Sequence, residues 1–240
     1  MTLIAFEGLP GAGKSTQSRL LAEHLDRAGH AVVYLPDNLT RDTDDLGATL
    51  LSLFTRGDPF ARHDSVVTEV HLAAAIRTHT LATHIEPTLD QRRTVVEDRG
   101  LHTMYSYSLA TLLQRHRSAP DLAIAWLYAV GALTGRAADR SLWLRLPVDE
   151  AIARAEHRQR HPYTAEQRLY LRYVDDAYRE LADRDPTLIV VDVAGRTVNE
   201  VHAAVLAALA GDLAASRSNS RPLVPTQRGP AATKRRPGMR

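Results

Sequence analysis

The chain has 240 residues, of which 44% are hydrophobic, and its formal net charge is +2 at pH 7. That length and apolar content suit one globular domain with a sizeable core. The absence of cysteine excludes disulfides and thiolate metal sites, and no apolar run is long enough to predict a membrane span. We expect a cytoplasmic protein, because the first residues form a core strand and leave no room for a signal peptide.

The charge is distributed unevenly along the chain. Residues 211–240 contain one acidic side chain, Asp212, and seven basic ones: Arg217, Arg221, Arg228, Lys234, Arg235, Arg236 and Arg240. This segment carries +6, which leaves residues 1–210 at about −4. Because it is rich in Pro, Ser and Gly without apolar periodicity, we predict a folded domain over 1–210 and a disordered basic tail over 211–240. The tail would either bind nucleic acid or a partner, or have no function of its own, and we favour the second interpretation. We do not expect the folded domain to bind nucleic acid.

Five short apolar runs alternate with helical patterns. The predicted strands cover residues 3–6, 31–35, 94–97, 141–146 and 188–191. One predicted helix follows the first strand and ends at Gly29; the others cover 46–54, 66–85, 105–117, 122–133, 148–158, 165–182 and 198–209. We expect the helix over 66–85 to stop near Pro87. Strands that alternate with helices predict an α/β fold: a five-stranded parallel sheet with helices on both faces.

The strongest motif follows the first strand. Gly8, Gly13, Lys14 and Ser15 have the spacing of the phosphate-binding loop, G-x-x-x-x-G-K-[ST], between a strand and a helix. The glycines let backbone N–H groups surround a polyphosphate at the helix N-terminus. Lys14 would reach the β- and γ-phosphates of ATP, and the Ser15 hydroxyl would hold Mg²⁺. The candidate ATP-binding residues are Gly8, Leu9, Pro10, Gly11, Ala12, Gly13, Lys14, Ser15 and Thr16.

Polar residues also follow three other predicted strands. Asp37 comes after the second strand, Asp98 and Arg99 after the third, and Gly195 after the fifth. Because ligands of parallel sheets bind at the carboxyl ends of the strands, we expect these residues to converge with the phosphate loop. Asp98 would orient Mg²⁺ or its waters, and Arg99 would grip an acceptor phosphate through its bidentate fork. A solvated helix cap is the alternative interpretation of Asp98 and Arg99.

Arginines also gather around an apparent break between two later helices, at Arg154, Arg158 and Arg160. Arginines on a mobile lid would close over the transferring phosphate and exclude water, a role that we assign to Arg158 and Arg160. A basic, solvated helix end is the competing interpretation. The eleven histidines match no metal-ligand pattern, and we assign none of them a catalytic role.

In this order, the motifs resemble the thymidylate (dTMP) kinase family of P-loop nucleoside monophosphate kinases, over about residues 1–210. The segments that carry the resemblance are FEGLPGAGKST at 6–16, IEPTL at 85–89, VVEDR at 95–99, LWLRLPV at 142–148 with AIARA at 151–155, and YRELA at 178–182 continuing through Val191, Asp192 and Val201.

The resemblance implies roles for individual residues. Arg77 would contact the thymine base, Arg99 would bind the monophosphate, and Tyr107 would pack under the deoxyribose and help to exclude a 2′-hydroxyl. The loop around Gly195 would lie beside adenine. Ala12 is not basic, which is similar to family members whose catalytic arginine lies in the lid, and this favours Arg158 or Arg160.

The departures from the family pattern concentrate in the base pocket. Ala73 stands where a phenylalanine usually stacks on thymine, Gly100 where an aromatic residue is common, and Met104 where a polar residue is common. The segment over 36–40 keeps an acid, Asp37, but lacks the family's arginine. Loss of an aromatic stack costs on the order of 1 kcal/mol or more unless another ring replaces it.

We therefore predict a kinase that transfers the γ-phosphate of ATP, with Mg²⁺, to a deoxypyrimidine monophosphate, dTMP giving dTDP. Two alternatives stay open: a related P-loop kinase for a modified nucleotide, a nucleoside or another small metabolite, and an ATP-binding regulatory protein without turnover. Because related kinases are often dimers, a homodimer is a further expectation. Expected catalytic residues are Lys14, Asp98, Arg99, Arg158 and Arg160; acceptor-binding residues are Asp37, Arg77, Arg99 and Tyr107; metal-binding residues are Ser15 and Asp98.

Overall fold

The structure is a computed structural model that describes residues 2–41, 44–56, 60 and 65–211. The chain divides into two compact units, Met1–Leu209 and Ala210–Arg240. Apart from Gly211, the segment predicted to be a disordered tail lies outside the described residues, so that prediction stays untested.

Five strands form one parallel sheet in the order β2-β3-β1-β4-β5. They are β1 (Leu3–Glu7), β2 (Val32–Leu35), β3 (Thr94–Asp98), β4 (Arg140–Arg145) and β5 (Leu188–Asp192). The register places Phe6 opposite Asp98 and Leu35 opposite Glu97, so the carboxyl ends of β1, β2 and β3 lie side by side. All five residues of β1 are buried, as expected for the central strand of a sheet that is covered on both faces.

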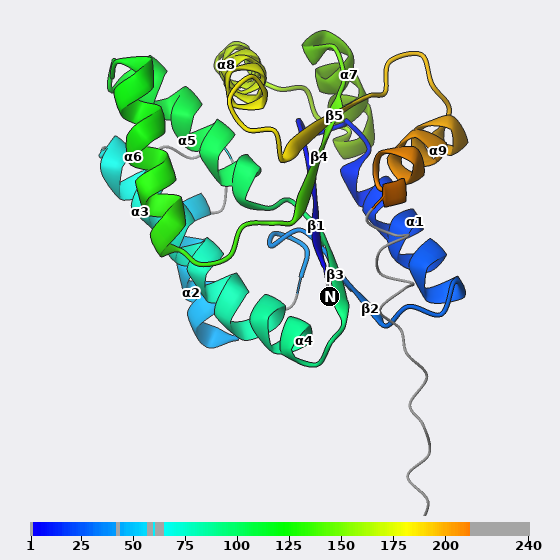
Figure 1. The fold of residues 1–240 in the computed structure, drawn as a ribbon. Coiled ribbons are helices and arrows are strands. Elements are labelled where there is room, and N and C mark those ends of the chain that lie inside the picture. Colours follow the sequence, from blue (N-terminus) through cyan, green and yellow to red (C-terminus); the bar gives the residue numbers. More distant parts are fainter. Residues whose placement is uncertain (1, 42–43, 57–59, 61–64, 212–240) are drawn as a thin grey trace, which may run out of the picture. The chain divides into compact units, whose positions relative to one another are not determined.

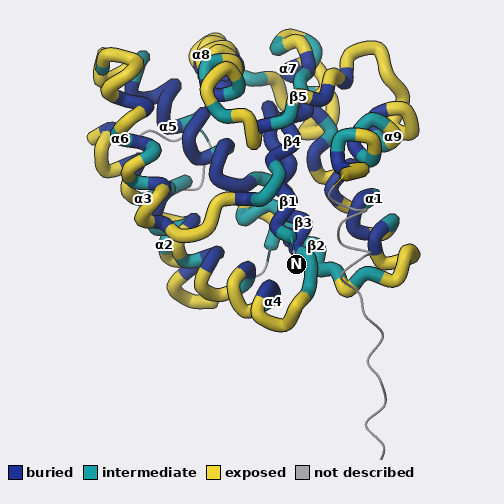
Figure 2. The backbone as a smooth tube through the Cα atoms, in the orientation of Figure 1, coloured by how far each residue is buried: buried dark blue, intermediate teal, exposed yellow. Residues whose placement is uncertain are grey.

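Helices cover both faces of this sheet (Figure 1). On one face lie α1 (Lys14–Arg27) and α9 (Val198–Ala208). The other face carries α3 (Val66–Thr80), α4 (Glu86–Asp90), α5 (Leu101–Arg115) and α8 (Ala165–Ala182), with α2 (Asp45–Thr55) against α3, α6 (Pro120–Leu133) against α5, and α7 (Val148–Gln159) against α8. Burial is concentrated on the strands and the inner sides of the helices (Figure 2). This architecture confirms the predicted fold class, and no helix within the described ranges is both long and apolar enough to cross a membrane.

The prediction that the long helix ends near Pro87 was wrong. After α3, a π-helical turn, η1 (Leu81–Ile85), leads directly into α4, which contains Pro87 in its first turn. Proline is tolerated there because the first N–H groups of a helix have no intrahelical partner to lose.

Helix α5 begins four residues earlier than the sequence predicts, because a distant carboxylate caps it. Glu7, at the end of β1, is fully buried and accepts hydrogen bonds from the backbone N–H groups of Gly100 (3.1 Å) and His102 (3.2 Å) and from the Thr103 hydroxyl (2.5 Å). These N–H groups belong to the start of a helix, where they lack intrahelical acceptors and where a negative charge is favourable.

The buried side chain of His102 connects the start of α5 to residues near the amino ends of β4 and β5. The Nδ1 atom of His102 lies 3.0 Å from the Ser141 hydroxyl, and its Nε2 atom lies 3.0 Å from the Asp185 carboxylate. The hydrogen bond to His102 holds the pKa of Asp185 well below its usual range, with further help from Thr187 and against the effect of burial.

We expect Asp185→Asn to lower the free energy of unfolding at pH 7 by about 1–2 kcal/mol, because it weakens a partly buried charge-assisted hydrogen bond. Since the folded-state pKa of Asp185 is depressed, the carboxylate's contribution is present above its unfolded pKa of about 4 and is lost as pH falls below that value. The difference between variant and parent should therefore shrink below pH 4. Denaturant unfolding at stepped pH measures it, with Asp121→Asn, an exposed carboxylate, as control. A difference that persists unchanged to pH 2 would contradict this account.

Candidate active site

The loop after β1 packs too tightly against its surroundings to carry side chains at two of its glycines. A Cβ on Gly11 would lie 2.2 Å from the backbone oxygen of Ala151 in α7, and one on Gly8 would lie 2.8 Å from that of Leu144 in β4. Both glycines have positive φ, +86° and +130°, a conformation that side chains disfavour. The loop thus wraps the start of α1 in the form that the phosphate-binding motif requires.

Lys14 is buried inside this loop, where its Nζ donates a hydrogen bond to the backbone oxygen of Leu9 at 2.8 Å. Burial, and secondly the nearby positive charge of Arg99, lower the pKa of Lys14 to about 7, against the opposing effect of carboxylates that include Asp98. Because negative charge favours the protonated amine, a polyphosphate in the loop would restore the charge of Lys14.

Ser15 and Asp98, the two predicted metal-binding residues, are in contact. The Ser15 hydroxyl donates to Asp98 Oδ2 at 2.5 Å, while the other carboxylate oxygen, Oδ1, is buried and has no hydrogen-bond partner among the described residues. A hydroxyl and a carboxylate with a free oxygen fit Mg²⁺, which is commonly held by one or two carboxylates together with the phosphates of a nucleotide. The described part of the chain holds no cluster of three or more His, Asp or Glu side chains that would bind a metal without a nucleotide.

Arg99 contacts two other predicted site residues, Asp37 and Tyr107. Its Nε donates to Asp37 Oδ2 at 2.6 Å, and its guanidinium lies 5.8 Å from the ring centroid of Tyr107. Its backbone φ is +73°, with the N–H bonded to the Phe6 oxygen at 3.0 Å. Positive φ is uncommon for a residue with a side chain and is found preferentially at functional sites. Asp37 and Arg99 therefore meet, as expected from the strand ends, and Tyr107, which only the family resemblance indicated, lies beside them.

Arg77 forms a buried ion pair that the sequence analysis did not foresee. Its Nη1 and Nη2 atoms donate to the two carboxylate oxygens of Glu97, at 2.6 and 3.1 Å. Arg77 is 5% exposed and Glu97 1% exposed. In the sequence, Glu97 is simply the end of a strand, and nothing local marks it as the partner of a residue twenty positions earlier.

Arg41 is a second residue that the sequence analysis missed, because the comparison with the family stopped at residue 40. Its Nη2 donates to Asn38 Oδ1 at 2.5 Å and to the Thr80 hydroxyl at 3.2 Å. Burial lowers the pKa of Arg41, whereas the carboxylates of Glu97 and Asp37 oppose this effect. Arg41 therefore belongs to the same cluster of charges as these two acids.

The two predicted lid arginines lie at the C-terminal end of α7. Arg158 is in the last turn of α7 and Arg160 caps that helix with φ +57°. Both side chains are exposed. Within the described residues, neither side chain forms a hydrogen bond or an ion pair. By contrast, Arg154 pairs with Glu150 in the same helix.

Tyr163, which follows α7, is a further candidate that the sequence analysis missed. Its ring packs edge-to-face on Phe60 at 5.1 Å, and its backbone N–H donates to Glu156 at 2.7 Å. Burial raises the pKa of Tyr163, Tyr107 adds to the rise, and the positive charges of Arg158 and Arg99 oppose it. The pKa of Tyr163 thus responds to charges of both a predicted lid arginine, Arg158, and a predicted acceptor residue, Arg99. Only its aromatic character next to a basic segment could have indicated it.

Gly195 lies in the exposed turn after β5, with φ +67° and no atom of the described residues within 4 Å of where its Cβ would be. Gln17, one turn into α1, connects this region to the phosphate loop, because its side-chain amide donates to the backbone oxygen of Val198 at 2.9 Å. The open space beside Gly195 leaves room for a ligand group.

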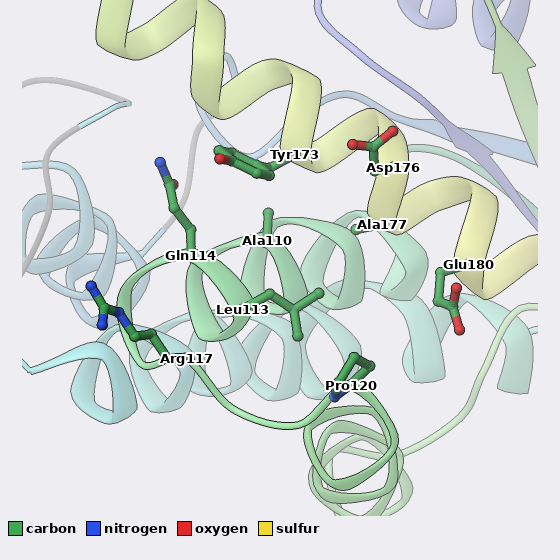
Figure 3. Close-up of a pocket in the computed structure, with 9 residues that line it drawn as sticks. All are labelled: Ala110, Leu113, Gln114, Arg117, Pro120, Tyr173, Asp176, Ala177 and Glu180. Atoms are coloured by element: carbon green, nitrogen blue, oxygen red, sulfur yellow. The ribbon is translucent and has the colours of Figure 1, made fainter.

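A cavity of about 470 Å³ lies elsewhere, between α5, the start of α6 and α8 (Figure 3). Tyr173, Asp176 and Glu180 line it from α8, opposite Leu113 and Gln114 of α5. None of the predicted site residues lines this cavity, so it is separate from the residues that converge at the strand ends.

Comparisons with known proteins place this geometry in a family. A family model described as thymidylate kinase matches residues 6–205. A protein named thymidylate kinase from Symbiobacterium thermophilum is 31% identical over 206 residues, which cover 82% of this chain and 87% of that protein. Another of that name from Gluconobacter oxydans is 34% identical over 212 residues, covering 86% and 92%.

A solved structure agrees at the level of the fold. Thymidylate kinase from Ehrlichia chaffeensis superposes with a TM-score of 0.62 at 20% identity, over 87% of this chain and 98% of that one. Because the matched region of the family contains the phosphate loop, the Asp98–Arg99 turn and the segment after α7, the chain belongs to the thymidylate kinase family of nucleoside monophosphate kinases.

Proposed function

We propose that this protein uses ATP and Mg²⁺ to phosphorylate dTMP to dTDP. The observation that carries the proposal is the adjacency of two half-sites. The phosphate loop with Lys14 follows β1, and the Asp98–Arg99 turn follows β3, whose register sets Phe6 opposite Asp98. A donor phosphate in the loop would therefore lie beside an acceptor phosphate held by Arg99, in the geometry that phosphoryl transfer requires.

On the donor side, the backbone N–H groups of the loop would hold the β- and γ-phosphates, with Lys14 as the charged side chain. Ser15 and Asp98 would hold Mg²⁺, which would neutralise charge on the donor phosphates. The adenine would lie in the open space beside Gly195.

On the acceptor side, Asp37 orients Arg99 through its Nε atom, and the described structure assigns no hydrogen bond to the two terminal nitrogens of Arg99. These nitrogens form the planar fork that binds a phosphate in bidentate fashion. A phosphate monoester is largely ionised near neutral pH, since its second pKa is about 6. Catalysis therefore needs positioning and charge neutralisation, and no strong general base.

The lid arginines would complete the site by movement. Arg158 and Arg160 are exposed and unpaired within the described structure, so neither has to break an ion pair before turning toward the γ-phosphate. We propose that closure of the segment after α7 brings one of them to the donor and excludes water. A cytoplasmic location, a homodimer and the disordered tail over 211–240 remain predictions from the sequence.

An assay of ADP release with ATP and Mg²⁺ tests the proposal, with dTMP, dUMP, other nucleoside monophosphates and free nucleosides as acceptors. We expect dTMP to be the preferred acceptor. A better acceptor than dTMP would overturn the dTMP assignment and indicate a specialised base pocket. ATP binding without product from any acceptor would overturn the kinase proposal and favour a regulatory protein.

Arg99→Ala should leave ATP binding nearly unchanged and reduce kcat with dTMP about 10²–10³-fold, because the charge-stabilising fork at the acceptor phosphate is lost. Arg154→Ala is the control, since Arg154 pairs with Glu150 on the surface of α7 and such pairs contribute little. Steady-state kinetics and a separate ATP titration measure both effects. Unchanged turnover in Arg99→Ala would refute the role of Arg99.

ATP binding should be coupled to proton uptake by Lys14. Above pH 7 the amine is mostly neutral in the free protein, because burial lowers its pKa to about 7, and it must gain a proton to bind polyphosphate. Above pH 7 we expect uptake that grows with pH toward about one proton per ATP bound, with affinity falling as pH rises to 9. Calorimetry in two buffers of different ionisation enthalpy measures the uptake. Lys14→Arg should abolish this proton uptake. Equal proton uptake by the parent and the Lys14→Arg variant would contradict the assignment of the uptake to Lys14.

A further inference from the structure

The ion pair between Arg77 and Glu97 links α3 to the end of β3, one residue before the Asp98–Arg99 motif. Both terminal nitrogens of Arg77 are bonded to Glu97, in the parallel two-bond arrangement that fixes a guanidinium in orientation as well as position. With both side chains buried, Arg77 has one arrangement available in the described structure. The pair therefore determines which edge of the arginine remains for a ligand.

Gly100 provides the space that Glu97 occupies. A Cβ at Gly100 would lie 2.7 Å from Ala5 Cβ, 2.7 Å from Glu97 Oε1 and 3.0 Å from Glu7 Oε1. The backbone φ of Gly100 is −111°, which any residue can adopt, so the position needs the absence of a side chain and not unusual backbone freedom. The absence of a side chain at Gly100 therefore leaves room for the Glu97 carboxylate as well as for Ala5 and Glu7.

Stability alone does not explain this pair. Burial raises the pKa of Glu97, Arg77 opposes that effect, and the neighbouring Glu7 carboxylate reinforces it. Buried ion pairs usually add little over apolar residues of the same shape, because desolvation of both charges offsets their attraction. Such a pair fixes the geometry of its two side chains, here at the carboxyl ends of the strands, where the proposed acceptor residues lie.

The fixed arginine still has one free donor. Its Nε is buried and has no hydrogen-bond partner among the described residues, which leaves a donor for a ligand atom that accepts a hydrogen bond. Ala73 lies one helical turn before Arg77 on α3, so the position that lacks the stacking ring is next to this arginine. Without the ring, recognition of a base depends more strongly on Arg77.

We propose that Glu97 is a positioning residue for the acceptor site: it locks Arg77 so that a single N–H donor faces the base, with Gly100 making room for the lock. This inference rests on the proposed function, in which Arg77 contacts the base of dTMP. Arginine offers donors only, so a base edge that carries a carbonyl oxygen is accepted and one that carries an amino group is not. Glu97 is therefore a determinant of pyrimidine selectivity, although it does not touch the substrate.

The test is Glu97→Gln, which keeps the shape of the side chain and removes the charge that holds Arg77. We expect KM for dTMP to rise about tenfold with KM for ATP within about twofold of the parent, because only acceptor binding is affected. The ratio of kcat/KM for dTMP over dCMP should fall by a similar factor. Glu69→Gln is the control, since the buried Glu69 on α3 also pairs with an arginine, the more exposed Arg115, at 2.8 Å. It should alter thermal stability without raising KM for dTMP selectively.

A second variant guards against misfolding. Glu97→Asp retains the charge but withdraws it by one methylene, and it should give an intermediate rise in KM for dTMP. Unchanged dTMP affinity and selectivity in both Glu97 variants, or equal changes in both KM values, would overturn the inference while the proposed function stands. Absence of dTMP turnover in the unmodified protein would overturn the proposed function instead, and the variants would then be compared with the acceptor that the panel identifies, for which the same split is expected.

Discussion

The site depends on one buried carboxylate at the end of the central strand. Glu7 receives the N–H groups at the start of α5 and the Thr103 hydroxyl. Its other neighbour is the Tyr178 hydroxyl of α8, at 3.5 Å, which in turn accepts the N–H of Gly8 at 3.1 Å and lies 3.0 Å from Thr103. Glu7 thereby connects three parts of the structure: the start of α5, α8 through Tyr178, and, through the same tyrosine, Gly8 at the start of the phosphate loop. Because the bonds of Glu7 to Gly100, His102 and Tyr178 are buried and those of Thr103 are partly buried, loss of one partner would leave buried polar groups unsatisfied.

This arrangement also limits which parts can move. Tyr178 stacks on Trp143 of β4 with ring centroids 5.5 Å apart and an interplanar angle of 13°, so the middle of α8 is held against the sheet. The basic segment between α7 and α8 is anchored at both ends by packed helices, while Arg158 and Arg160 are exposed. Hinged loops between rigid elements are the usual means of closing an active site. Closure would therefore rotate the segment about its ends without disturbing the loop that holds the donor.

The sequence predicted the parts of the site that depend on local patterns. Apolar runs identified the strands, and the spacing from Gly8 to Ser15 identified the loop, because each signal lies within a short window. The side-chain pairs were not predictable in this way. Arg77 and Glu97 are twenty residues apart, and the cap of α5 comes from another strand, so only the folded chain reveals them. Pro87 misled the analysis because a proline signals a helix end in general, yet is compatible with a first turn.

The charges around the proposed acceptor site give a reason for the proposed lid. The described cluster sets three arginines against four carboxylates: Arg41, Arg77 and Arg99 against Glu7, Asp37, Glu97 and Asp98. Such a cluster fixes its arginines in place but has no excess of positive charge to offer. The polyphosphate of ATP and the monophosphate of dTMP would bring many negative charges into the same space, and repulsion between them opposes transfer. In the proposed mechanism the balance must come from Lys14, Mg²⁺ and an arginine from outside the cluster. The open site then lacks part of the positive charge that phosphoryl transfer needs. In this mechanism, transfer occurs only after closure brings a lid arginine to the phosphates.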